Sequence, residues 1–357
     1  MLRKTPLWLA LFAALAVAQP EQPRQRMMES ASFPRLAELA VTPPAEWASG
    51  EPGKMQLKAR SCVANPDRAG LRRRIVDIAT QEWAWFGFNV DDLHGQTPPS
   101  PARNNNRNNQ GNLNQNNGDN ARRFPPLDAT EVAQVAHTIG GYWAAIPDAS
   151  WIWARQNEAW NENGLGARWR DPWSAAFISW VMCESGIGEQ AEFQRAIAHH
   201  SYIDQAIRAR DNPQSTALFA AYQPGEQVIN PGDLLCSGLR PMYRTLAERR
   251  AQLGVGARTH CDIVVEVNEA AKQILTIGGN VRSSVRMKVF PAAVEPSGNL
   301  APLPTNRYIF AHLKLRTDTI AADAVRSSAT LRALSCERSD MPSSLATASL
   351  TLTRSSC

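Results

Sequence analysis

A buried helix is predicted to begin within Asp171-Pro172-Trp173-Ser174-Ala175-Ala176-Phe177-Ile178-Ser179-Trp180. Asp171 is expected to cap this helix, and Pro172 suits its first position. Apolar side chains then recur at helical spacing until Gly186, a residue type that commonly ends a helix. Ser174 therefore falls in the first turn of a helix that is apolar enough to lie in the core.

The position of Ser174 gives its hydroxyl a chemical setting. Backbone N–H groups in the first turn of a helix have no acceptor within the helix, and the helix dipole is positive at that end. Both features stabilise negative charge that develops on the oxygen of an attacked carbonyl group. Ser174 is therefore a candidate nucleophile.

The periodicity on either side of this helix indicates the fold class. Helical spacing extends from Leu71 to about Phe88 and from Asp128 to Trp143, and the three arginines at 72–74 are expected to form the solvated end of the first of these helices. Helices followed by consecutive strands predict an α+β domain with helices packed on a mostly antiparallel sheet. The predicted strands are Asp233–Ser237, Asp262–Val267, Gln273–Gly278, Ser284–Phe290 and Tyr308–Leu315.

The N-terminus has the features of a secretory signal peptide. Arg3 and Lys4 precede an apolar stretch from Leu7 to Val17, and small residues follow at the expected cleavage site, so residues 1–18 are predicted to be removed. The apolar stretch is too short to span a bilayer, and we expect no transmembrane segment after its removal. The protein is expected to be exported, either to the periplasm or out of the cell.

Composition divides the rest of the chain. Residues 19–66 are predicted to form a polar tail and residues 67–316 a single domain. A disordered insertion is predicted at about 96–126, since ten of the seventeen residues from Asn104 to Asn120 are asparagine. Residues 317–357, which are rich in Ala, Ser and Thr, are predicted to be a low-complexity, poorly ordered C-terminal extension.

Charge and cysteine content limit the possible partners. The formal net charge of +5 falls to +3 without Arg3 and Lys4, which does not favour a nucleic-acid partner. Cys-x-x-Cys pairs and His/Cys clusters with zinc spacing are absent from the sequence, so we expect no metal and no other cofactor. In an oxidising compartment the six cysteines can form disulfides: Cys62, Cys183, Cys236, Cys261, Cys336 and Cys357.

The serine-containing stretch resembles a motif of papain-like cell-wall peptidases, the group that includes the NlpC/P60 and CHAP domains. Their motif, Trp-Cys-Ala-Ala-Phe-Val-Ser-Trp, opens the catalytic helix, and its second residue is the nucleophilic cysteine. Six residues of this chain match the motif, while Ser174 takes the place of the cysteine: Trp173, Ala175, Ala176, Phe177, Ser179 and Trp180. The resemblance implies a papain-like fold.

Two further elements extend the resemblance in the order that the family requires. Pro231-Gly232-Asp233 is similar to the turn before the first core strand, and the run from His260 to Val267 is similar to the strand that begins with the catalytic histidine. Asn280 follows the next strand, where the family has its imidazole-orienting residue. The resemblance therefore implies Ser174 as nucleophile, His260 as base and Asn280 as orienter.

A closer likeness is to a bacterial family catalogued only as domain of unknown function 2272. The chain shares its Pro-Trp-Ser-Ala-Ala-Phe-Ile-Ser run, its His-Cys-Asp-Ile-Val-Val strand and a His-x-x-Tyr-Ile element. Either His199 or His200 can supply the histidine of that last element, together with Tyr202. Further candidates for the cleft are Asp171, Trp173, His200, Tyr202 and Asp262.

The tryptophans admit two interpretations. Trp83, Trp143, Trp173 and Trp180 are expected to fill the core, although Trp173 is also a cleft candidate. The stretch with Trp151, Trp153 and Trp160 is more polar, and these side chains are open to either a core or a cleft position.

A Cys236–Cys261 disulfide is expected because the papain-like family pairs as neighbours the two strands that carry these cysteines. The bridge would fix the strand that carries His260.

Three functions remain open from the sequence. The first is an amidase or peptidase that cleaves cell-wall peptides through Ser174, with peptidoglycan as the partner. The second is a catalytically silent domain that binds cell-wall peptides in the same cleft. The third is a hydrolase that uses another nucleophile, such as a cysteine thiol.

Overall fold

The computed structural model describes residues 35–58, 61–65, 68–96, 129–147 and 149–337, together with residues 345, 348 and 350. The predicted signal peptide at 1–18 and the asparagine tract at 104–120 lie outside these residues.

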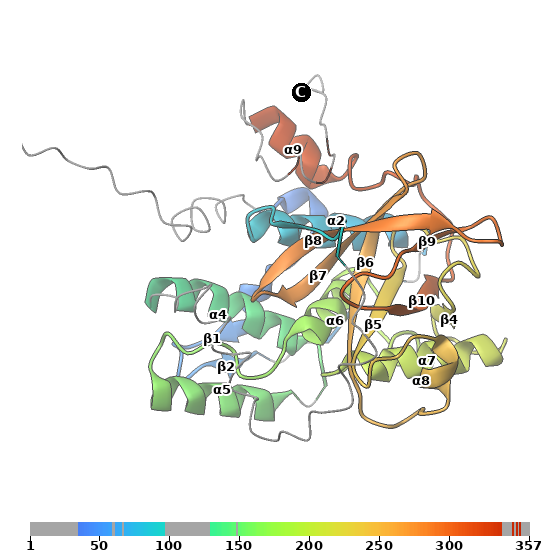
Figure 1. Cartoon of the computed structure of the whole chain (residues 1–357). Helices are drawn as coiled ribbons and strands as arrows, with labels where there is room; N and C mark the ends of the chain where they lie inside the picture. Colours follow the sequence, from blue (N-terminus) through green and yellow to red (C-terminus); the bar gives the residue numbers. More distant parts are fainter. Residues whose placement is uncertain are drawn as a thin grey trace, which may run out of the picture.

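A mostly antiparallel sheet of eight strands forms the centre of the molecule (Figure 1). Its strands run in the order β3-β8-β7-β6-β5-β10-β4, and β9 extends it by pairing with β8. Only the short strand β3 pairs in parallel, with β8. The strands are β3 Val90–Asp92, β4 Phe219–Tyr222, β5 Leu234–Arg240, β6 Arg258–Asn268, β7 Gln273–Val281, β8 Ser284–Val294, β9 Leu300–Pro302 and β10 Ile309–Leu315; β1 Ala48–Ser49 and β2 Gln56–Leu57 form a separate pair.

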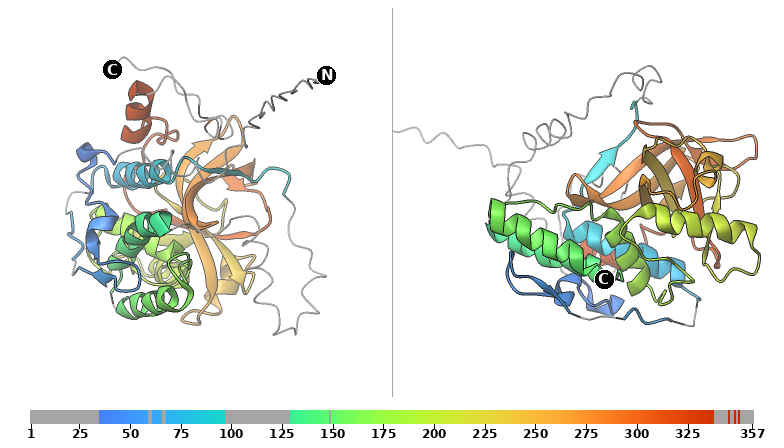
Figure 2. Two further views of the ribbon diagram at one scale, coloured as in Figure 1. Left: turned by 90° about the vertical axis from the view of Figure 1, so that its left-hand side faces the viewer. Right: turned by 90° about the horizontal axis from the view of Figure 1, so that it is seen from below.

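The helices gather beside this sheet, as two further views show (Figure 2). Helices α2, α6 and α7 contact its strands, and α4 packs against α6. None of the helices in the described residues is long and apolar enough to cross a membrane. The helices are α2 Leu71–Trp85, α4 Ala129–Ala144, α5 Ser150–Asn163, α6 Ser174–Glu184, α7 His199–Asp211, α8 Leu246–Arg250 and α9 Ala329–Glu337, with 3-10 turns η1 Ala37–Leu39 and η2 Pro44–Trp47.

The predicted α+β class is confirmed, and helix α6 lies in the middle of the core. Phe177 and Trp180 of α6 are fully buried, and both pack against the ring of Tyr142 from α4. Helix α6 also meets the sheet through Phe177, because a Cβ added at Gly279 of β7 would lie 2.5 Å from the Phe177 Cβ. Because glycine has no side chain, helix and strand approach closely at this point.

A buried carboxylate, Asp233, ties helix α2 to the sheet. Its Oδ1 accepts a hydrogen bond from Arg72 Nη1 at 2.7 Å, and its Oδ2 lies 2.8 Å from His312 Nε2. Arg72 also donates to the Pro231 carbonyl at 2.8 Å. The prediction of a solvated arginine end is therefore wrong for Arg72, which is 1% exposed, because the turn before β5 presents acceptors to it.

Parts of the two segments that were predicted to be a polar tail and a poorly ordered extension belong to the fold. Residues 35–58 contain η1, η2 and the β1–β2 pair, and the Cys62–Cys183 disulfide joins the adjoining segment to α6. Residues 317–337 include α9, which contacts α2 and buries Leu331 and Leu334. Their weak periodicity concealed this packing, because only a few apolar side chains in each segment reach the core.

Replacing Arg72 should destabilise the protein strongly. In Arg72→Leu the Asp233 carboxylate stays buried without its cationic partner, so the free energy of unfolding should fall by about 3–5 kcal/mol. Chemical denaturation of the purified protein measures this change. Arg73 is the matched control, because it pairs with Asp77 nearer the surface, and Arg73→Leu should cost about 1 kcal/mol. Equal losses in the two variants would contradict the role given to Asp233.

Candidate active site

Ser174 is the first residue of helix α6, and its side chain is 8% exposed. The first intrahelical hydrogen bond runs from Phe177 N–H to Trp173 O at 3.0 Å, so the N–H groups of residues 174–176 precede it. These amides can stabilise an oxyanion. Asp171 does not cap the helix as predicted, because its carboxylate lies 3.4 Å from Arg155 of α5 and Trp173 occupies the cap position.

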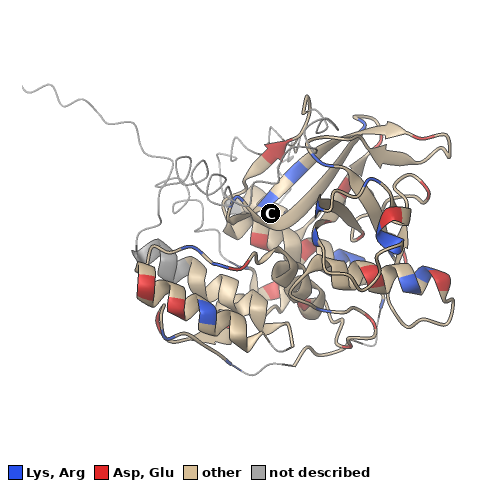
Figure 3. Ribbon diagram, turned by 60° about the horizontal axis from the view of Figure 1, so that its bottom comes forward, with Lys and Arg blue, Asp and Glu red and all other residues tan. Residues whose placement is uncertain are grey.

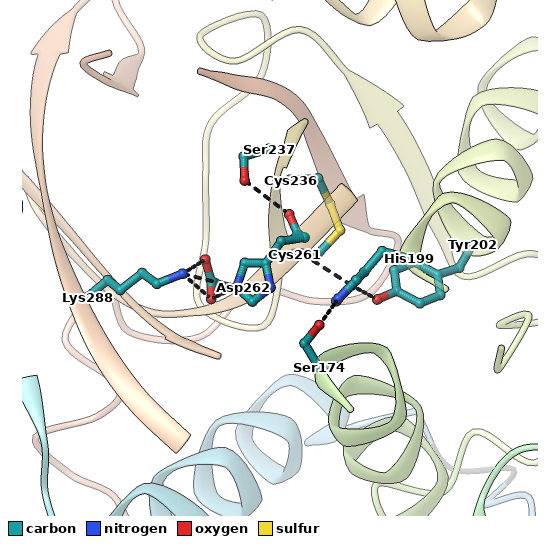
Figure 4. Close-up of a disulfide and its surroundings, with 9 residues drawn as sticks. Ser174, His199, Tyr202, Cys236, Ser237, Cys261, Asp262 and Lys288 are labelled. Carbon is teal, nitrogen blue, oxygen red and sulfur yellow. Dashed lines mark hydrogen bonds and ion pairs between the residues drawn. A yellow bond between two sulfur atoms is a disulfide. The ribbon is translucent and has the colours of Figure 1, made fainter. Parts of the chain in front are cut away.

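The imidazole of His199, the first residue of α7, contacts the Ser174 hydroxyl. Ser174 Oγ and His199 Nε2 are 2.6 Å apart. On the other side of the ring, Nδ1 accepts a hydrogen bond from the Cys261 backbone N–H at 3.2 Å and contacts the Tyr202 hydroxyl (Figure 4). Three separate elements, α6, α7 and β6, therefore meet at this ring.

The Cys261 N–H fixes the proton on the His199 ring. A backbone N–H can only donate, so Nδ1 must present its lone pair, and in the neutral ring the proton then lies on Nε2. Nε2 consequently donates to Ser174 Oγ. Burial, reinforced by the neighbouring His260, lowers the pKa of His199 well below its usual value and keeps the ring neutral. In this state His199 is a hydrogen-bond donor at the serine, not a base.

A second imidazole, His260 of β6, lies beside the first. The two ring centroids are 5.2 Å apart. His260 Nε2 is 2.8 Å from Asp262 Oδ1 and 3.0 Å from Lys288 Nζ, and Lys288 also donates to both oxygens of Asp262. Figure 4 shows Lys288 reaching Asp262 from β8.

Charge and burial act in opposite directions on this second cluster. Burial lowers the pKa of His260 below its usual value, although Asp262 favours the protonated ring. Burial opposes ionisation of Asp262, but His260 and Lys288 together hold the pKa of that carboxyl well below its usual range. His260 is therefore neutral near pH 7 and lies beside a carboxylate that can stabilise the imidazolium once the ring accepts a proton.

Gly278 of β7 makes room for this buried cluster. A Cβ at this position would lie 1.8 Å from Asp262 Oδ1 and 3.2 Å from His260 Nε2. The Gly278-Gly279 pair therefore allows β7 to pass close to Asp262 on one side and to Phe177 of α6 on the other. The two glycines of the Ile-Gly-Gly-Asn stretch are therefore explained by the lack of space for a side chain at either position.

Asn280 does not hold the imidazole. Among the residues that the structure describes, its side chain has no hydrogen-bond partner, and its backbone is left-handed with φ 54° after an irregularity in β7. The residue that contacts the His260 ring is instead Asp262, two residues later on the same strand, whose Oδ1 lies 2.8 Å from His260 Nε2. Alternation places residues i and i+2 on one face of a strand, which could have identified Asp262 from the sequence.

Of the two adjacent histidines, His199 and not His200 reaches the serine. His200 points to a neighbouring loop, where its Nδ1 lies 3.1 Å from the Ala257 carbonyl. The His-x-x-Tyr spacing separates His199 from Tyr202 by three residues, which places both on one helix face. This spacing was a signal for His199, whereas Lys288 had no sequence signal because a strand pairing brings it to the cluster.

Most of the tryptophans named in the sequence analysis lie in the core, and Trp151 is exposed. Trp173 is buried and stacks between Phe86 and Tyr142, so it belongs to the core and not to a cleft. Trp153 and Trp160 are also buried and pack on Trp169. Trp151 is 44% exposed.

The cysteines form disulfides, as expected for an oxidising compartment. The expected Cys236–Cys261 bridge is present and joins directly opposite residues of β5 and β6. In the part of the chain that the structure describes, no cysteine is free. This finding removes the described thiols from the list of candidate nucleophiles.

Comparisons with known proteins give one family. A model of the family described as "Uncharacterized protein conserved in bacteria (DUF2272)" matches residues 132–314, a span that contains Ser174, His199, His260 and Lys288. No curated protein and no solved structure matches the chain.

The neutral state of His199 should make stability depend on pH. Because its pKa is lower in the folded state, the unfolded chain binds a proton more readily, and stability should fall as the pH drops below about 6.5. Denaturation curves at pH 7.5 and pH 5 should show a smaller loss in His199→Gln than in the native protein. Gln214→Asn is the control, because Gln214 is exposed and the substitution changes no titratable group, so the pH dependence should stay as in the native protein. An unchanged pH dependence in His199→Gln would contradict a neutral His199.

Proposed function

Because the chain belongs to the DUF2272 family, whose description names no activity, we propose a function from the geometry of the site: an exported, papain-like hydrolase of the NlpC/P60 type that cleaves amide bonds in cell-wall peptides. The observation that carries this proposal is the Ser174 hydroxyl, which lies at the N-terminus of α6 and 2.6 Å from an imidazole nitrogen. The motif order from Ser174 through the turn at Asp233 to His260 supports the papain-like assignment.

In the proposed reaction, Ser174 Oγ attacks the carbonyl carbon of the amide, and its proton passes to His260. Asp262 stabilises the imidazolium that forms, as the carboxylate does in serine hydrolases. The C–N bond then breaks, and His260 returns the proton to the departing amine. A water molecule hydrolyses the acyl-serine with His260 again acting as base.

His199 has a different role in this scheme. In the resting site its Nε2–H donates to Ser174 Oγ. In the proposed reaction this donor shifts to the adjacent carbonyl oxygen as Oγ bonds to the carbonyl carbon, and it stabilises the oxyanion together with the N–H groups of the first turn of α6. A neutral imidazole is suited to this task, because it donates without introducing a buried charge. Tyr202 and the Cys261 N–H act as positioning groups, since both hold the far side of the ring.

Cell-wall peptides are the proposed substrate because of compartment and resemblance together. The N-terminal sequence predicts export, and the disulfides fit an oxidising compartment. The enzymes that the Ser174 motif resembles act on cell-wall peptides.

A silent peptide-binding domain is the second candidate. The observation that favours it is that His199 donates to Ser174 and does not accept its proton. In a thiol enzyme, the corresponding cysteine would ionise readily beside histidine, whereas a serine needs a base to remove its proton during attack. The two candidates therefore differ in whether His260 can reach the serine proton.

Incubation of the purified mature protein with peptidoglycan sacculi, followed by mass spectrometry of the released fragments, tests hydrolysis. We expect the native protein to release peptide fragments and Ser174→Ala to lower turnover by at least about 10³-fold, because the nucleophile is lost. Activity confined to Ser174→Cys would instead favour the silent binding domain. Unreduced activity in Ser174→Ala would exclude Ser174 as nucleophile.

The two histidines should respond differently to the same substitution. His260→Gln removes the base and should abolish the pH dependence of the residual turnover, with a loss of about 10⁴-fold. His199→Gln keeps an N–H donor, so it should lose no more than about 10²–10³-fold and keep the pH profile of the native protein. Rates measured from pH 5 to 9 distinguish the two roles. A flat profile in His199→Gln would identify His199 as the base.

A further inference from the structure

Two arginines face each other at the end of the strand pair that carries His260. Arg240 of β5 is the register partner of Arg258 of β6, and a bulge after Gly238 precedes this pair. Like charges directly opposite each other on a ladder destabilise a sheet unless an anion or a carboxylate compensates them. An anion bound between the two side chains would relieve this repulsion.

The described residues do not supply such a partner. Both arginines are exposed, and neither side chain has a hydrogen bond or an ion pair to any of these residues. They line an open surface pocket of about 480 Å³ together with Gly256 and Ala257. Figure 3 shows how acidic and basic residues are distributed along the ribbon.

This pocket adjoins the candidate active site. Arg258 precedes His260 by two residues on β6, so both side chains leave the same face of the strand, about 6.6 Å apart along the chain. The Ala257 carbonyl of the pocket lies 3.1 Å from His200 Nδ1, a contact that joins the pocket to the first turn of α7. A ligand in the pocket would thus lie next to the reacting groups.

We propose that Arg240 and Arg258 bind a carboxylate of the substrate beside the bond that is cleaved. The guanidinium fork matches a carboxylate in geometry and forms two parallel hydrogen bonds with it. This inference rests on the proposed function, and it specifies the substrate class: a peptide that carries a free carboxylate close to the scissile amide. Neutral or amidated peptides would bind weakly.

Arg307 is the competing cation. It is half-buried and precedes β10 by two residues, and its side chain has no hydrogen-bond or ion-pair partner among the described residues. Burial lowers the pKa of Arg307, while Asp262 raises it, so its charge acts on the catalytic cluster. An exposed, opposed pair in a pocket can receive a ligand from solvent, whereas Arg307 has a carboxylate of the protein in its vicinity.

Binding to the Ser174→Ala protein tests the proposal without requiring turnover. The probes are disaccharide peptides released from sacculi by a muramidase, and the same peptides after their carboxylates are amidated. Titration calorimetry should show that Arg240→Gln/Arg258→Gln, introduced into the Ser174→Ala protein, raises the Kd for the unmodified peptides by roughly tenfold or more. Amidated peptides should bind equally weakly to both proteins.

Arg208→Gln/Arg332→Gln is the matched control, because it removes two exposed arginines from helices α7 and α9. It should leave the Kd unchanged. This result would show that binding depends on the pocket arginines and not on the net charge of the protein. Equal Kd values for unmodified and amidated peptides, or a loss that occurs in Arg307→Gln but not in the double variant, would overturn the proposal. So would the absence of binding to unmodified peptides. If the native protein does not hydrolyse sacculi but the carboxylate-dependent loss is found, the hydrolase proposal fails and the binding pocket stands.

Discussion

The ion cluster around Asp233 is the interaction on which the rest of the structure depends. A fully buried carboxylate is stable only when its charge is compensated, and here Arg72 of α2 and His312 of β10 compensate it. Burial opposes its ionisation, but these partners hold the pKa of Asp233 below its usual value. Since Asp233 directly precedes β5, the cluster fixes the strand beside β6 and thereby the platform for the candidate site.

The residues of the site are positioned on this platform by the pairing of strands β5 and β6 and not by loops. The Cys236–Cys261 bridge and the ladder hold β6 so that its backbone meets α7 at Cys261, while its side chains at His260 and Asp262 form the second cluster. The same strand therefore orients both imidazoles, one through a backbone N–H and the other through its own side chains. A site held in this way keeps the two rings close together, with their centroids 5.2 Å apart.

The sequence was informative where the signal was local. Helix α6, the strand that begins near His260 and the Cys236–Cys261 pair could each be predicted, because periodicity or a motif marks them. The partner of Ser174 could be predicted only in part: the His-x-x-Tyr-Ile element marked His199 or His200 as a candidate, but the contact itself depends on the packing of α7 against β6. Burial of Arg72 was missed for a related reason: a charged residue at a helix start looks solvated until the acceptors that face it are known.

The two glycines of β7 have an evolutionary consequence. An alanine at Gly279 would push the strand away from helix α6, whereas an alanine at Gly278 would displace only the buried carboxylate and the imidazole beside it. A side chain at the first position would thus disturb the fold, and one at the second would disturb the ionic cluster. Among relatives, loss of glycine at the second position together with loss of the acidic residue would mark lineages in which selection on the chemistry has relaxed while the architecture persists.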